Sequence, residues 1–149
     1  MLIYIGADHR GFKFKERLKA ILHDQGYEVT DVGNEIYDEK DDYPDFAAEV
    51  GRRVSAESGG NRGVLICGSG AGVDIVANKF HDVRSVLGIS TDQVFDARHD
   101  DDVNVLSLSA DFTSEADAEK MVRVFLDTPF SGEERHKRRL KKIAAADNQ

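Results

Sequence analysis

The chain has 149 residues, the usual length of one domain, and 40% of them are hydrophobic. A chain of this length buries about 68–70% of its unfolded surface, which is enough for a proper core. The net charge of −8, from 20 basic and 28 acidic residues, argues against nucleic acid as the main partner, because neutralising phosphates needs a basic face.

The first residues of the chain indicate where the protein resides. Residues 1–6 already read as a strand, and they include neither a long apolar stretch nor a basic leader. We therefore expect no signal peptide, no membrane span and no membrane partner. The single cysteine, Cys67, excludes an intramolecular disulfide framework and suits a reducing compartment, so we expect a cytoplasmic protein.

Apolar runs typical of strands alternate with stripes typical of helices along the first half of the chain. The expected elements are, in order, a strand at Leu2–Ile5, a helix from Phe12 to near Gly26, a strand at Tyr27–Val32, a helix from Tyr43 to Val54 and a turn at 59–61. An acidic loop separates the second strand from the second helix.

The alternation continues through the second half. The expected elements are a strand at Gly63–Cys67, a helix at Gly70–Lys79, a strand at Val83–Ile89, a helix at Thr91–His99, a strand at Val103–Leu108, a helix at Ser114–Leu126 and a basic helix from about Gly132. The third of the five strands is apolar at nearly every position, as expected for a strand covered on both faces.

Five strand–helix units in series predict an α/β fold, a doubly wound five-stranded parallel sheet with helices on both faces, in a Rossmann-like three-layer sandwich. One domain is expected over residues 1–149. Ligands of such sheets bind beyond the carboxyl ends of the strands. The segments that we assign to this edge are Gly6–Gly11, Gly33–Tyr43, Cys67–Gly72, Asp100–Asn104 and Ser109–Asp111.

The segment Cys67–Gly72 carries the clearest chemistry. Three alternate glycines allow a close backbone approach to a ligand, and the loop leads into a helix whose amide groups favour negative charge and the thiolate form of the cysteine. With the Ser69 hydroxyl, these groups suit a base that removes a proton next to a carbonyl and donors that hold the resulting enediolate. The alternative is a structural cysteine beside an ordinary glycine-rich turn. The loop matches neither phosphate-binding fingerprint of nucleotide proteins.

Two other pairs are candidates for the same site. Asp8 and His9 follow the first strand and could open a sugar ring or bind an anion; otherwise they are a helix cap and an exposed histidine. Arg135 and Arg139 are four residues apart and share one helix face, which suits a phosphate. Their alternative is general surface charge.

The sequence contains no recognisable metal-binding motif. Asp100, Asp101 and Asp102 could suggest Mg²⁺ binding, but the side chains of consecutive residues diverge, which favours a solvated loop. We expect neither a metal nor a cofactor.

Motifs from nearly the whole chain resemble those of the family of ribose-5-phosphate isomerase B and the galactose-6-phosphate isomerase subunits. They are Gly6-Ala7-Asp8-His9-Arg10-Gly11, Asp42-Tyr43-Pro44, Ile66-Cys67-Gly68-Ser69-Gly70-Ala71-Gly72, Ala77-Asn78-Lys79 with Arg84, Asn104-Val105-Leu106, and Arg135-His136 with Arg139. The combination of Asp-His, the cysteine loop and Ala-Asn-Lys at these spacings is specific.

The resemblance implies a metal-free aldose–ketose isomerase of a phosphorylated sugar, by default of ribose 5-phosphate to ribulose 5-phosphate. Cys67 would move the proton, Ser69 would help to stabilise the enediolate and Asp8 would assist ring opening. The substrate-binding residues would be His9, Tyr43, Gly68, Gly70, Ala71, Gly72, Arg135 and Arg139. The family also implies a homodimer or homotetramer, in which the C-terminal helix packs on a neighbouring subunit and completes its site.

Three positions depart from the family pattern. The family has a ring-opening histidine in the segment before the fifth strand, whereas this chain offers Asp100 and Asp101 there, with His99 one position earlier. After the fifth strand the family tends to have an arginine, where this chain has Asp111. Each close acid would oppose a phosphate by about 1 kcal/mol. We therefore count His99 and Asp100 as alternative ring-opening residues and Asp101 as substrate-binding. The alternative functions are isomerisation of another sugar phosphate or an unphosphorylated sugar, or non-catalytic binding of a sugar phosphate.

Overall fold

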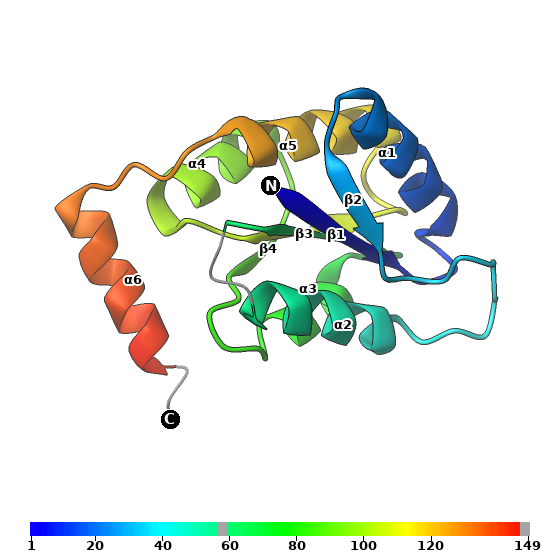
Figure 1. The fold of residues 1–149 in the computed structure, drawn as a ribbon, viewed down its shortest axis with the longest axis horizontal. Coiled ribbons are helices and arrows are strands. Elements are labelled where there is room, and N and C mark those ends of the chain that lie inside the picture. Colours follow the sequence, from blue (N-terminus) through cyan, green and yellow to red (C-terminus); the bar gives the residue numbers. More distant parts are fainter. Residues whose placement is uncertain (57–59, 147–149) are drawn as a thin grey trace.

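The computed structural model describes residues 1–56 and 60–146, which form a three-layer α/β sandwich (Figure 1). All five strands are parallel and lie in the order β2-β1-β3-β5-β4. The strands are β1 (Leu2–Ala7), β2 (Glu28–Asp31), β3 (Arg62–Cys67), β4 (Ser85–Leu87) and β5 (Val105–Ser109). The predicted fold class is confirmed.

The helices cover both faces of the sheet. They are α1 (Phe12–Asp24), α2 (Tyr43–Ala56), α3 (Ala71–Ala77), α4 (Thr91–Asp101), α5 (Glu115–Asp127) and α6 (Glu134–Ala146). Buried side chains of α1, α4 and α5 form one hydrophobic core with one face of the sheet, and those of α2 and α3 form a second core with the other face.

The pleat of the strands determines which core each residue enters. In β3, Val64 and Ile66 are buried toward α1 and α5, whereas Leu65 and Cys67 are buried toward α2 and α3. Burial on both faces explains the unbroken apolar sequence of this strand. It also places the cysteine at the last position of a central strand, directly before α3.

The predicted element boundaries differ from the structure by a few residues. The fourth strand is limited to Ser85–Leu87, because the Asn78 side chain bonds both the amide and the carbonyl of Ser85 and so fixes the turn that precedes the strand. The third helix ends at Ala77, and the C-terminal helix begins after Gly132, which has a left-handed φ of 66°. Part of the turn predicted at 59–61 lies outside the described residues.

Helix α6 stands apart from the three layers (Figure 1). Its main contact with them is the C-terminal part of α4. The link is local: the amide of Ser131 donates to the carbonyl of His99, and the Ser131 hydroxyl bonds Nδ1 of His136 at 2.6 Å. Within the described ranges, every helix is too short or too polar to cross a membrane.

Candidate active site

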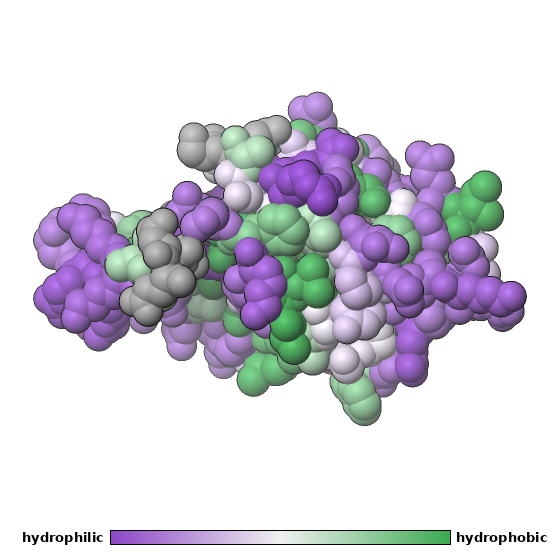
Figure 2. Space-filling model, turned by 90° about the horizontal axis from the view of Figure 1, so that it is seen from below, coloured by the Kyte–Doolittle hydropathy of each residue, from purple (hydrophilic) through white to green (hydrophobic). Residues whose placement is uncertain are grey.

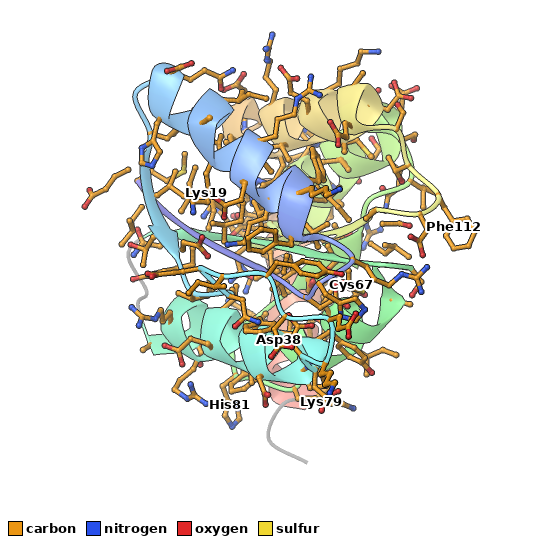
Figure 3. All side chains as sticks on the ribbon, turned by 90° about the vertical axis from the view of Figure 1, so that its right-hand side faces the viewer. Lys19, Asp38, Cys67, Lys79, His81 and Phe112 are labelled. Atoms are coloured by element: carbon orange, nitrogen blue, oxygen red, sulfur yellow. The ribbon has the colours of Figure 1, made fainter. Side chains whose placement is uncertain are left out.

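Cys67 lies at the carboxyl edge of the sheet, which faces the viewer in Figure 3. Its side chain is buried, and the amide of Gly70 donates to Sγ at 3.2 Å. Gly70 has a left-handed φ of 76°, and a Cβ atom there would lie 2.5 Å from a Leu87 methyl carbon. The backbone conformation that directs an amide at the sulfur therefore requires glycine.

The segment after β5 fixes the other side of the cysteine loop. The amide of Ala110 donates to the carbonyl of Cys67 at 2.9 Å, and the carbonyl of Gly68 accepts both the Ser109 hydroxyl and the Asp111 amide. Ser69 is exposed at the tip of the loop, where its Oγ accepts the Ala71 amide at 3.3 Å. The Ser69 hydroxyl hydrogen remains available to a ligand.

Tyr43 and Asp8 also lie at this edge. A Cβ atom on Gly72 would lie 2.6 Å from the Tyr43 ring, so the ring packs directly against the start of α3. Asp8 is buried, and its Oδ1 accepts the amides of Arg10 and Gly11. These bonds form a turn before α1, whose N-cap is Gly11 and receives no side-chain bond, so Asp8 is not the helix cap given above as its alternative. They hold the carboxyl group at the carboxyl end of β1, next to β3.

His9 is held by a residue that the sequence reasoning missed. Oδ1 of Asp41 accepts a hydrogen bond from the backbone amide of His9 at 2.9 Å and lies 2.7 Å from Nδ1 of the His9 ring. The Asn34 side chain donates to Oδ2 of the same carboxylate. The hydrogen bond to Asp41 is the largest cause of a raised His9 pKa, and the nearby Asp8 charge adds to it. The sequence feature that could have indicated Asp41 is its place in the acidic loop after β2, at the edge of the sheet where ligands bind.

Asp111 lies beside the loop, as its position after β5 predicts, and it forms an ion pair with Arg10 at 2.5 Å. The sequence analysis assigns Arg10 no role beyond its place in the motif Gly6–Gly11. The structure thus brings a cation to the place where the departure from the family pattern had indicated the loss of one.

The placement of Asp100–Asn104 at the carboxyl edge was wrong. In a parallel sheet the helix between two strands returns the chain to the opposite edge, so the end of α4 and the segment before β5 lie at the amino ends of the strands. His99, Asp100 and Asp101 are therefore remote from Cys67 within one protomer. The same holds for α6, which carries Arg135 and Arg139 and lies at the end of the molecule opposite to the one seen in Figure 3.

The residues at this second edge form a cluster of their own. His99 Nδ1 lies 2.7 Å from Oδ1 of Asp100, and Nδ1 of the fully buried His136 lies 3.6 Å from the same oxygen. The hydrogen bond from His99 is the largest cause of a lowered Asp100 pKa, and the Arg135 charge contributes. Asp101 and Arg139 are exposed.

Among the described residues, His99, Asp100 and His136 are the group whose donor atoms all lie within 4.8 Å of one another, close enough for a shared metal ion. The Nδ1 atoms of both histidines are already engaged, that of His99 by the Asp100 carboxylate and that of His136 by the Ser131 hydroxyl. That the protein uses no metal remains a prediction.

The chain thus presents two clusters of candidate residues at opposite edges of the sheet. The first, here called the cysteine edge, comprises Asp8, His9, Tyr43, Cys67 and the loop Gly68–Gly72. It offers a thiol under a backbone amide, a hydroxyl and a histidine whose pKa is raised by its hydrogen bond to Asp41. The second, the histidine edge, comprises His99, Asp100, Asp101, Arg135 and Arg139. It offers an imidazole–carboxylate pair and two exposed guanidinium groups.

Comparison with known proteins gives one consistent family. Residues 3–143 match the family model described as Ribose/Galactose Isomerase. A probable ribose-5-phosphate isomerase B of Mycoplasma genitalium is 40% identical over 141 residues, which cover 95% of this chain and 92% of the relative. A ribose-5-phosphate isomerase B of Mycobacterium tuberculosis is 35% identical over 144 residues, 97% of this chain and 88% of the relative.

Solved structures give the same result. The crystal structure of ribose-5-phosphate isomerase B from Mycoplasma genitalium, with bound ribulose-5-phosphate, superposes with a TM-score of 0.95 at 38% identity, covering 99% of this chain and 97% of that one. The enzyme from Clostridium thermocellum superposes with a TM-score of 0.92 at 33% identity, covering 99% and 98%.

Proposed function

Because this chain belongs to the ribose/galactose isomerase family, we propose that it interconverts ribose 5-phosphate and ribulose 5-phosphate by proton transfer at Cys67. The observation that carries the proposal is the Cys67 sulfur at the end of β3, bonded by the Gly70 amide in a loop of further donors. The ribulose-5-phosphate bound to the Mycoplasma genitalium enzyme supports this substrate pair.

The chemistry needs one base and a set of donors. The Cys67 thiolate removes the proton from C2 of the open-chain aldose, and the electron pair forms the C1–C2 double bond of an enediolate. The amides of the loop and the Ser69 hydroxyl stabilise the oxygen that gains negative charge. Cys67 then returns its proton to C1, and a proton moves from O2 to O1, which gives the ketose.

Ring opening needs an acid, for which His99 is the better of the two candidates. The hydrogen bond from His99 lowers the pKa of Asp100, so that carboxylate is ionised at neutral pH and has no proton to donate. Its role is to hold the imidazole by the 2.7 Å contact at Nδ1. His99 can then exchange a proton with the ring oxygen through its other nitrogen.

A second copy of the chain would unite the cysteine edge of one subunit and the histidine edge of the other into one site, of which each edge is a half-site. The histidine edge cannot reach the cysteine edge of its own protomer, so a symmetric dimer, or a tetramer built from it, is required to bring them together. Exposed apolar side chains support such an interface: Ile75 on α3 is 60% exposed, and Phe112 after β5 is 84% exposed. Figure 2 shows apolar surface gathered on the face that α2 and α3 cover. The C-terminal helix would then pack on the neighbour.

The test is isomerisation of ribose 5-phosphate in D₂O, compared with a panel of other aldoses with and without phosphate. We expect ribose 5-phosphate to be preferred and the ribulose 5-phosphate product to carry deuterium at C1, because a cysteine proton exchanges with solvent. Preference for another sugar phosphate or an unphosphorylated sugar would replace the substrate assignment. Binding without any turnover would overturn the enzymatic one.

A further inference from the structure

An ion pair between Arg10 and Asp111 lies across the cysteine loop. Nη2 of Arg10 is 2.5 Å from Oδ2 of Asp111, which joins the turn before α1 to the turn after β5. Both side chains are partly exposed, at 56% for Arg10 and 31% for Asp111. Exposed ion pairs contribute only about 0–1 kcal/mol to stability, so folding alone gives little reason for this one.

The pair rests directly on the backbone of the loop. A Cβ atom on Gly68 would lie 2.8 Å from Nε of Arg10 and equally close to Oδ2 of Asp111. The amide of Asp111 donates to the carbonyl of Gly68 at 3.0 Å, which fixes the main chain of the acid relative to the loop. The guanidinium is therefore held over the loop that leads to Cys67.

The guanidinium still has donors to offer. Asp111 engages Nη2, and no other described residue accepts from Nε or Nη1. The neighbouring residue, His9, has a pKa raised by its hydrogen bond to Asp41, with the Arg10 charge opposing, and its protonated form is a second cation at the same turn. A planar guanidinium with free donors beside a second cation is suited to the oxygens of a phosphate.

We propose that Arg10 binds the phosphate of the sugar substrate and that Asp111 is a positioning residue, which turns the guanidinium over Gly68. This inference rests on the proposed function. It resolves the conflict posed by an acid at position 111, because the carboxylate that would repel the phosphate is instead the group that holds a cation toward it.

The proposal predicts unequal effects from the two members of the pair. Arg10→Ala removes a phosphate ligand and also exposes the Asp111 carboxylate to the phosphate. In Arg10→Ala/Asp111→Asn the repelling charge is gone, so part of the lost affinity returns. A purely structural pair would instead make the double variant no better than the single one.

The experiment measures KM and kcat for ribose 5-phosphate together with competitive inhibition by inorganic phosphate. For Arg10→Ala we expect KM and the inhibition constant to rise about tenfold or more. The kcat should change less than about twofold, because the phosphate is bound equally in the substrate and in the transition state. The double variant should lie between Arg10→Ala and wild type. Arg17→Ala is the matched control, since Arg17 in α1 is 62% exposed and forms a 2.6 Å pair with Glu115 of α5.

The inference falls if Arg10→Ala retains the wild-type KM and phosphate inhibition, or if Arg17→Ala loses as much. The role of Asp111 falls if the double variant is as weak as Arg10→Ala. Should the wild type not isomerise ribose 5-phosphate, the proposed function fails separately, and thermal stabilisation by inorganic phosphate then tests Arg10 on the same variants. Equal stabilisation of wild type and Arg10→Ala, including none in either, would overturn the inference.

Discussion

At the scale of single residues, the side chains at the cysteine edge are positioned by partners distant in sequence. Asp41 lies 32 residues from His9 and holds it through two contacts, and Asp111 holds Arg10. Cys67, Asp8 and His9 could be predicted as candidate site residues, because they carry chemically active side chains and lie at or directly after the end of a strand. Asp41 and Arg10 could not, because their roles depend on the path of a loop and on a side-chain rotamer.

The His9–Asp41 contact predicts a pH dependence. The pKa of His9 is raised in the folded state. The stability that the contact with Asp41 provides is therefore fully present below the unfolded-state pKa of about 6.5, where His9 is charged. It is lost as the pH rises through the folded-state pKa. Phosphate binding should weaken over the same interval. KM for ribose 5-phosphate, measured from pH 6 to 9, should therefore rise with an inflection above about 6.5.

Asp41→Asn is the matched variant, since the amide keeps the shape of the side chain and removes its charge. We expect the inflection in KM to move to lower pH in this variant, while ionisation of the substrate phosphate affects both proteins equally. An unchanged inflection would show that the titration does not belong to His9.

At the scale of elements, the order of strands and helices follows from the sequence. The edge of the sheet at which each loop lies depends in addition on whether the loop follows or precedes a strand. Hydrophobic runs identify all five strands. The segment Asp100–Asn104 was assigned to the wrong edge because it precedes a strand, and only segments that follow strands reach the carboxyl edge. The requirement for glycine at position 70 depends on Leu87, a residue of β4 that packs against it only in the folded chain.

Gly70→Ala tests the conformation of the loop. Left-handed φ costs a residue with a Cβ about 1–2 kcal/mol, and the contact with Leu87 and the carbonyl of Leu108 adds to that. Gly26→Ala is the control, because Gly26 has a similar φ of 82° and no atom within 4 Å of the added Cβ. In urea unfolding, Gly70→Ala should lose clearly more stability than Gly26→Ala, and it alone should lose isomerase activity. Equal losses of stability would show that the loop can relax.

At the scale of the whole molecule, the two half-sites at opposite edges make assembly part of the proposed mechanism. The order of elements places the segment before β5 at the amino ends of the strands, but residue types do not separate the two edges, because both carry polar residues at element ends. The position of α6 relative to the sheet becomes visible only in the folded structure (Figure 1).

Mixing two inactive variants tests the assembly. Cys67→Ala and His99→Ala each remove one half-site, so each should be nearly inactive alone. In a mixture that exchanges subunits at random, half of the dimers are hybrids with one intact site, and about one quarter of wild-type activity should return. Activity that stays at the level of the separate variants would mean that Cys67 and His99 do not act in one site across subunits.

Replacement of Cys67 tests whether this residue moves the proton. Cys67→Ala and Cys67→Ser should fold normally, because the sulfur makes one hydrogen bond in an otherwise intact loop, and their near-native far-UV spectra and melting temperatures will check this. We expect kcat for ribose 5-phosphate to fall by about 10³-fold or more in both, since neither side chain supplies an available base. Wild-type turnover in Cys67→Ala would show that Cys67 is not the base.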